Sequence, residues 1–136
     1  MEINAIKPND TVYVWEKFGQ SIIEGKIGMS SEDKKYGTVY DIKFLYIVDK
    51  DGHRHMTFGG NSQRLPKDIY KTPMEVWNMV NDENEKAYQQ FLSEINNVYD
   101  LIEFPLTHSF GECNDNISVV RAYKEKAKEL LGVVIN

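Results

Sequence analysis

The sequence predicts an α+β protein in which a small antiparallel sheet of four to five strands, residues 1–71, precedes a helical unit, residues 72–136. The first observation is the stretch YDIKFLYIVDKDGHRHMTF, residues 40–58, where two runs of alternating apolar and polar residues flank an Asp-Gly turn. That pattern is typical of a β-hairpin. The second is that apolar residues recur every three or four positions after residue 72, which indicates helices. A chain of 136 residues is long enough to bury a core without disulfides, and it has one cysteine.

In the first strand of the hairpin every second residue is apolar, so these side chains are expected on one buried face: Tyr40, Ile42, Phe44, Tyr46 and Val48. A two-residue loop at Asp51-Gly52 would pair apolar with polar side chains on that face. A three-residue loop, with Gly52 in the left-handed region, instead pairs Phe44 with Phe58, Tyr46 with Met56 and Val48 with Arg54. The apolar pattern favours the three-residue loop.

This register places His53 and His55 together on the outer face of the hairpin, where a His-x-His pair could bind a metal. The alternative is a pair of solvated histidines. Because a structural zinc needs about four ligands, the solvated pair is preferred and no metal is predicted.

The other strands are predicted at residues 11–18 and 21–29, and Gly25 and Gly28 are expected to form bulges or bends in the second of them. Residues 30–37 are polar and are predicted to form a mobile loop. A short closing segment follows at Leu65-Pro66 and Ile69-Tyr70.

This order of strands, followed by IYKTPMEVW at residues 69–77, resembles small bacterial and phage proteins in which an SH3-like barrel runs into a capped helix. The resemblance covers about half of the chain. It implies an N-terminal SH3-like small β-barrel that holds a peptide in an aromatic groove, binds nucleic acid or acts as a scaffold.

The first helix is predicted to begin at Thr72 as N-cap, with Pro73 at the first helical position and Glu75 completing a capping box. Its apolar stripe runs to a stop at Phe104-Pro105, across a polar patch at residues 81–85. A continuous helix is favoured there over two helices. The last helix is expected to begin near Ser118 and to end at Gly132, giving an acidic helical hairpin over residues 72–136. The apolar terminus, residues 133–135, is expected to dock on the body; the alternative is a contact with a partner.

Charge is unevenly distributed along the chain. Residues 1–71 hold 11 basic and 10 acidic side chains, whereas residues 72–136 hold 5 basic and 11 acidic ones. This excess argues against nucleic-acid binding by the helices and permits a basic protein partner, although a charged helix surface can serve solubility alone. The first ten residues lack the features of a signal peptide, and the longest apolar run, residues 44–48, is far shorter than a membrane helix. A cytoplasmic protein without membrane contact is predicted.

Reactive side chains gather in one loop, which contains His108, Ser109, Glu112, Cys113 and Asp115. Cysteine, histidine and an acid are the residues of thiol catalysis, and Cys113 with His108, His53 and His55 would be suitable zinc ligands. Nothing in their spacing indicates that they meet, so they are taken as ordinary loop residues, and neither a cofactor nor catalysis is predicted.

The leading hypothesis is a non-catalytic accessory protein that binds another protein. The resemblance to phage proteins implies the narrower role of a phage or mobile-element inhibitor of a host nucleic-acid-binding or defence protein. Its binding face would be formed by the helix carboxylates Asp82, Glu83, Glu85, Glu94, Asp100 and Glu103. The first alternative is a nucleic-acid-binding barrel that uses exposed lysines and the aromatic residues Tyr13, Trp15 and Tyr36. The second is a small enzyme built on the His108 and Cys113 loop.

Overall fold

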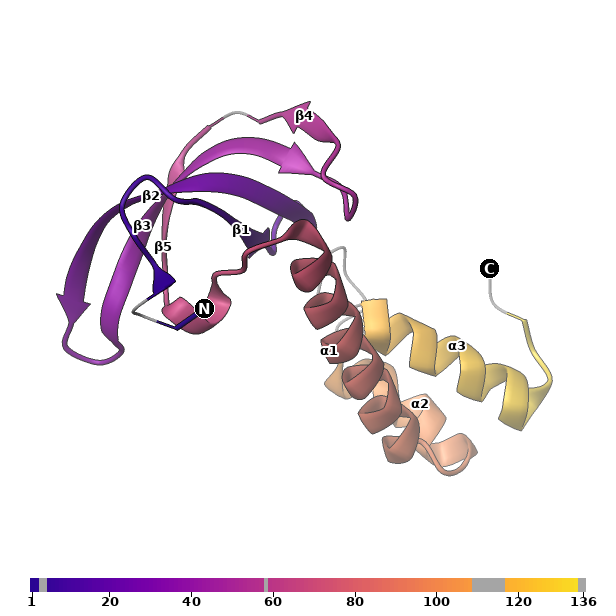
Figure 1. Cartoon of the computed structure of the whole chain (residues 1–136). Helices are drawn as coiled ribbons and strands as arrows, with labels where there is room; N and C mark the ends of the chain where they lie inside the picture. The colour runs from indigo at the N-terminus through magenta and orange to yellow at the C-terminus, as the bar shows by residue number, and fades with distance from the viewer. Residues whose placement is uncertain (3–4, 58, 109–116, 135–136) are drawn as a thin grey trace. The chain divides into compact units, whose positions relative to one another are not determined.

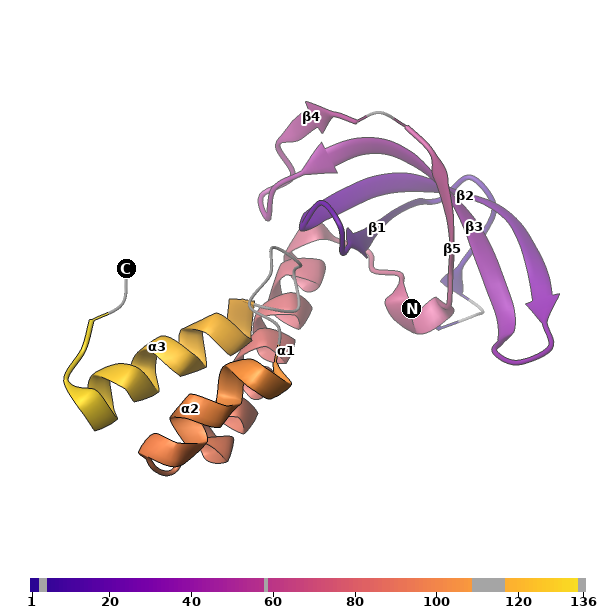
Figure 2. The same cartoon turned by 180° about the vertical axis from the view of Figure 1, so that it is seen from behind.

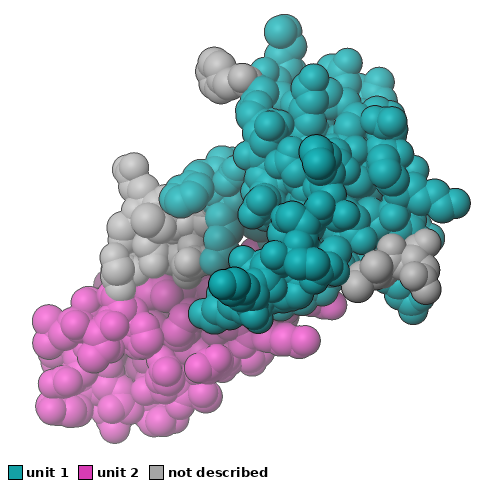
Figure 3. Space-filling model, turned by 90° about the vertical axis from the view of Figure 1, so that its left-hand side faces the viewer, with its two compact units in different colours: residues 1–80 teal, residues 81–136 magenta. Residues whose placement is uncertain are grey.

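The computed structural model describes residues 1–2, 5–57, 59–108 and 117–134. The chain divides into two compact units, residues 1–80 and residues 81–136, which are coloured separately in Figure 3. The division falls inside the first long helix, nine residues after the predicted boundary at residue 71. Each unit has a hydrophobic core of its own, and we describe the units in turn.

The first unit is built on an antiparallel sheet of five strands, which confirms the predicted number. Its strands are β1 (Thr11–Glu16), β2 (Ser21–Asp33), β3 (Gly37–Val48), β4 (Arg54–Met56) and β5 (Asn61–Arg64). The order is β1-β2-β3-β4, and β5 also pairs with β3. Figures 1 and 2 show a strongly curved sheet in which β2 and β3 project together past the other strands. The loop predicted at residues 30–37 is wrong, because most of this stretch continues the β2–β3 ladder to the pair Asp33 and Gly37.

The sheet is open, so the closed barrel predicted from the sequence is not formed. Strand β1 forms one edge, and β4 and β5 lie along the other. Two contacts nevertheless cover the main chain of the β1 edge. Tyr70 and Tyr13 exchange backbone hydrogen bonds of 2.9 Å, and Arg64 Nη1 donates to the carbonyl oxygen of Trp15 at 2.8 Å. Edge groups that are bonded in this way cannot pair with a foreign strand.

The predicted register of the β3–β4 hairpin is confirmed. Tyr46 pairs with Met56 and Val48 pairs with Arg54. Gly52 closes the three-residue loop with a φ of 88°, a conformation that favours glycine. The predicted pair of Phe44 and Phe58 lies outside the described residues, since Phe58 is not among them.

The predicted single apolar face of β3 is wrong beyond Phe44. Gly25 of β2 pairs with Phe44, and the residue before it, Glu24, pairs with Tyr46. Leu45, between Phe44 and Tyr46, is therefore an extra residue without an opposing partner. This β-bulge turns Tyr46 and Val48 to the opposite side of the sheet, because one added residue inverts the alternation. A second register shift follows Ile27, so both predicted irregularities, at Gly25 and at Gly28, are confirmed.

As a result the sheet packs on both sides. One core contains residues of β1, β2 and β3 together with one residue before β1 and one after β5. Its members are Ile6, Val12, Val14, Ile23, Ile27, Tyr40, Ile42 and Ile69. On the other side Ile22 and Val48 pack against Val76 and Val80, in the first three turns of the following helix.

The predicted start of the first helix is confirmed: α1 spans Pro73–Glu94, and the Thr72 hydroxyl accepts the backbone N–H of Glu75 at 3.2 Å. The Glu75 carboxylate accepts the N–H of Lys71 instead of that of Thr72, so the capping box is shifted by one residue. A short 3-10 helix, Pro66–Asp68, precedes this segment. The helix also continues across residues 81–85, as favoured.

The helical unit has three helices in the described residues, not the predicted two. After α1 the chain turns, and Asn97 caps α2 (Val98–Thr107) by accepting the N–H of Asp100 at 2.8 Å. Pro105 lies inside α2 and does not end it, because a proline near the C-terminal end removes only one hydrogen bond. Helix α3 spans Ile117–Leu131 and ends at Gly132, with a φ of 67°, as predicted.

The core of the second unit consists of Ile95, Leu101, Phe104, Val119 and Ala127, against which Phe91, Tyr123 and Leu130 pack. The expected docking of the C-terminal apolar residues is not seen for Val133 and Val134, which are 48% and 69% exposed. Among the described helices, none has the length and apolar character that a membrane span requires.

Candidate functional site

The strongest candidate site is a pocket of about 410 Å³ at one end of the sheet. It lies where β2 begins and β3 ends, close to the first turns of α1. Its lining combines two tryptophans and three aliphatic residues with a polar rim: Trp15, Trp77, Ile22, Ile47, Val48, Gln20, Ser21, Asp49, Lys50 and His55. A mostly apolar pocket with a few polar groups at its rim is the usual form of a ligand site.

The two tryptophans of the pocket are the only two in the sequence. Trp15 comes from β1, and its side chain packs with the core formed by the sheet and α1. Trp77 comes from the second turn of α1 and is 39% exposed. Lys50, from the β3–β4 loop, places its ammonium 5.7 Å from the centre of the Trp77 ring. The pocket therefore presents aromatic surface with one cation beside it.

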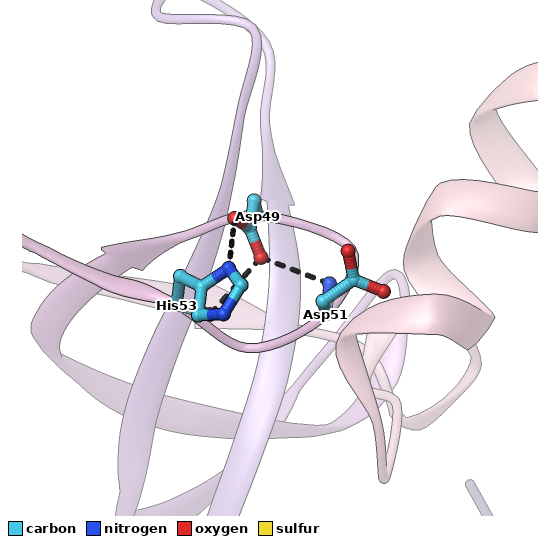
Figure 4. Close-up of side chains that lie close together, drawn as sticks. All are labelled: Asp49, Asp51 and His53. Carbon is cyan, nitrogen blue, oxygen red and sulfur yellow. Dashed lines mark hydrogen bonds and ion pairs between the residues drawn. The ribbon is translucent and has the colours of Figure 1, made fainter.

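Among the described residues, Asp49 is the only carboxylate that lines the pocket, and it is already engaged in the hairpin turn, as Figure 4 shows. Asp49 Oδ1 accepts the backbone N–H groups of Asp51 and His53 at 2.9 and 3.0 Å, and Oδ2 lies 2.8 Å from His53 Nδ1. The backbone hydrogen bond from His53 is the largest effect and holds the pKa of Asp49 below its usual value. The free charge at the rim is therefore positive.

The same turn contains the one group of three possible metal ligands among the described residues. The ligand atoms of Asp49, Asp51 and His53 lie within 4.8 Å of one another, at the exposed tip of the hairpin. Both oxygens of Asp49 are hydrogen-bonded within the turn, which accounts for the geometry without an ion. His55 is not part of this group.

A buried carboxylate near the pocket was not expected from the sequence. Glu24, near the start of β2, has a side chain only 4% exposed, and its Oε2 lies 3.0 Å from Nη2 of Arg54. The Tyr13 hydroxyl donates to Glu24 Oε1 at 3.0 Å, and Arg54 Nε lies 3.3 Å from the same oxygen. Arg54 also lies 4.9 Å from the centre of the Tyr46 ring. Burial, and then the Glu24 carboxylate, raise the pKa of Tyr13.

The carboxylates of the predicted acidic face do not share one role. Glu85 pairs with Arg121 at 3.0 Å and accepts from Gln89, and these two contacts hold its pKa below the usual value. Glu94 pairs with His108 at 2.9 Å, and Asp100 accepts the backbone N–H of Asn96. The remaining three, Asp82, Glu83 and Glu103, are exposed. That these residues bind a partner stays a prediction.

Of the predicted aromatic residues, Trp15 lines the pocket, Tyr13 bonds Glu24, and Tyr36 is 59% exposed in the β2–β3 turn with Lys35 over its ring. His108 packs its ring against Phe104 and Phe91. The rest of the predicted reactive loop, residues 109–116 with Cys113, lies outside the described residues.

No protein-family model, no curated protein and no solved structure matches the chain, so its function has to be argued from its own geometry. Sequence reasoning missed Trp77, Lys50 and Glu24. The signal for Trp77 was available, because a large aromatic residue five positions after an N-cap is placed in the second turn of the helix. Its position over the sheet depends on tertiary packing.

Proposed function

We propose that the chain is a non-catalytic binding protein that acts on another protein, and that the pocket formed by Trp15 and Trp77 receives a side chain of this partner. The observation that carries the proposal is the pairing of two tryptophans around an apolar floor of Ile22 and Val48. Tryptophan is the residue most enriched at the energetic centre of protein interfaces. A cytoplasmic location is part of the proposal.

The polar groups at the rim support binding more than catalysis. Asp49 is held by the turn, and the Ser21 hydroxyl donates to the carbonyl oxygen of Gly19 at 2.9 Å. Neither group is arranged as a nucleophile with an adjacent base. Binding and orientation are what such a rim can supply.

Charge favours a protein over a nucleic acid as partner. The chain carries a net charge of −5, and of the lysines in the first unit only Lys50 lines the pocket. Nucleic-acid sites need several cations to neutralise successive phosphates. The acidic helix residues remain a second proposed contact, through Asp82, Glu83 and Glu103, for a partner with a basic surface.

The SH3-like character of the sheet is also a proposal. What supports it is the 3-10 helix Pro66–Asp68, followed by a bridge between Tyr70 and Tyr13 of β1. Such proteins bind peptides beside aromatic side chains.

The test uses the two indole N–H signals of the chain in ¹⁵N-resolved NMR spectra, because both tryptophans line the pocket. Peptides are selected from a random library on the intact protein and are then titrated into it. We expect bound peptides to shift both indole signals and to lose affinity at least about tenfold with Trp77→Ala, the effect of one interface anchor.

Met74→Ala is the matched control, because Met74 is 40% exposed, close to the 39% of Trp77, lies in the same helix and does not line the pocket. Selected peptides that bind without moving either indole signal, or that tolerate Trp77→Ala as well as Met74→Ala, would show that the pocket is not the site.

A further inference from the structure

We propose that the partner segment is an extended, acidic peptide that adds as a strand to the free edge of β4, with an aromatic or aliphatic side chain in the two-tryptophan pocket. The inference rests on the proposed function of the pocket and adds the backbone conformation and the charge of the ligand. It follows from the pairing of β4 and from the charged groups around it.

Strand β4 is the last strand in the order β1-β2-β3-β4, and no described residue pairs with its outer side. The hairpin begins with the N–H of Asp49 donating to the carbonyl oxygen of His53 at 3.2 Å. Hydrogen-bonded and non-hydrogen-bonded pairs alternate along an antiparallel ladder, so Arg54 and Met56 fall at the non-hydrogen-bonded pairs. Their N–H and C=O groups therefore point away from β3, toward the open edge.

The two edges of the sheet differ in this respect. On β1, the Tyr13 main chain is bonded to Tyr70 and the Trp15 carbonyl to Arg64. On β4, all three residues are exposed, and Met56 is 91% exposed. An open edge with free donors and acceptors is the arrangement that accepts an added peptide strand. The edge and the pocket are continuous, because His55 belongs to β4 and also lines the pocket.

The charges around this edge select an acidic segment. The hairpin from residue 50 to residue 56 carries two cations, Lys50 and Arg54, and one acid, Asp51. The carboxylate of Asp49, which precedes this segment, already accepts the backbone N–H groups of Asp51 and His53. Arg54 shares its charge with Glu24, yet its side chain is 58% exposed. Lys50 is the cation closest to the pocket, so a carboxylate beside the inserted side chain would lie near its ammonium.

A single strand of nucleic acid could also stack on the tryptophans, but it has no main-chain N–H and C=O groups in the spacing of a β-ladder. The free groups of Arg54 and Met56 would then stay unpaired with the ligand. An added peptide strand uses both the edge and the pocket, which is why we argue for it.

The experiment titrates three sets of blocked hexapeptides into the intact ¹⁵N-labelled protein. In each set tyrosine or valine alternates with one residue type, which is glutamate, glutamine or lysine. We expect the glutamate set to bind at least about tenfold more tightly than the lysine set. Binding should shift both indole signals and should slow hydrogen exchange at the amides of Arg54 and Met56.

Two further measurements separate strand addition from simple capture by the pocket. Two series of peptides are N-methylated, one at the odd-numbered nitrogens and one at the even-numbered nitrogens. One series should lose binding and the other should bind nearly as the unmodified peptide does, because only every second N–H faces the edge. Met56→Pro should weaken binding without loss of the sheet, since the N–H that it removes points outward.

The acidic character of the ligand is tested at Lys50. Lys50→Gln should weaken binding of the glutamate set about threefold to fivefold, as expected for an exposed ion pair. The matched control, Lys43→Gln on β3, should leave it unchanged.

The outcomes distinguish the two proposals. If the indole signals shift but both N-methylated series bind as the unmodified peptides do, strand addition is wrong while the pocket remains a site. If the lysine set binds as well as the glutamate set, the acidic character is wrong. If no peptide shifts an indole signal, or if oligothymidylate binds at the pocket more tightly than every peptide, the proposed protein-binding function is wrong as well.

Discussion

The buried Glu24 gives the sharpest test of how the sheet is held together. Its carboxylate is 4% exposed and has three polar contacts, two from Arg54 and one from Tyr13. Arg54→Met removes two of these contacts, and the methionine retains an unbranched aliphatic side chain at this position. The carboxylate then stays in the same place with one hydroxyl as donor, and a buried charge with too few partners is costly.

The size of the effect follows from the burial of the two partners. Removing one member of a fully buried pair costs about 3 to 5 kcal/mol, and an exposed pair contributes about 0 to 1 kcal/mol. Glu24 is buried, but Arg54 is 58% exposed, so we expect the free energy of unfolding to fall by about 2 kcal/mol, between these limits.

The measurement is urea unfolding at neutral pH, with Lys43→Met as control, because Lys43 is exposed on the neighbouring strand and has no such partner among the described residues. The double variant with Glu24→Gln should recover part of the loss, since a neutral amide no longer requires a cation. If Arg54→Met and Lys43→Met both change stability by less than about 0.5 kcal/mol, the ordinary range for surface substitutions, the carboxylate does not depend on Arg54 and the reasoning is refuted.

Three further predictions concern local features. Gly25→Ala should lower the free energy of unfolding by about 1 to 3 kcal/mol in urea titration, because its Cβ would lie 2.6 Å from Ile42 Cγ2, whereas Gly19→Ala should change little. Asn97→Ala should cost about 1 kcal/mol by loss of the α2 N-cap, measured by thermal unfolding; an unchanged midpoint would contradict the cap. The lowered pKa of Glu85 means that its contribution is present above the carboxyl pKa of the unfolded chain and is lost as pH falls through the lowered folded value. Glu85→Gln should therefore flatten the decline of stability in acid, and a parallel decline would contradict its pairing with Arg121.

Local signals in the sequence predicted the elements whose geometry is fixed by neighbours in the chain. Thr72 and Pro73 marked the start of α1 because capping depends on three or four consecutive residues. The register of the β3–β4 hairpin followed from Gly52 and from the apolar pattern on either side. Gly132 marked the end of α3 in the same way.

The incorrect predictions concern elements whose conformation depends on residues far away in the sequence. The first helix was predicted to run to Phe104-Pro105, but it ends at Glu94, and the N-cap residue Asn97 is the local signal for the start of a new helix. The extension of β2 and β3 through residues 30–33 depends on their pairing with one another, since these side chains are polar and exposed. The pairing of Glu85 with Arg121 and of Glu94 with His108 likewise depends on tertiary packing, and partner binding by the acidic face stays a prediction.

The bulge at Leu45 explains both why β3 lacks the predicted single apolar face and why Val48 lines the candidate site. Strict alternation would have kept Val48 on the same face as Ile42, inside the first core, and away from α1. The extra residue turns Val48 toward Ile22, Val76 and Val80. The bulge lies beside Gly25, where the absence of a Cβ lets Ile42 and the Lys43 carbonyl approach closely. The floor of the pocket therefore depends on a glycine in β2, the strand that pairs directly with the strand of Trp15, β1. A side chain at Gly25 should consequently perturb the indole signals of both tryptophans as well as stability, which links the packing of the sheet to the capacity of the pocket to bind.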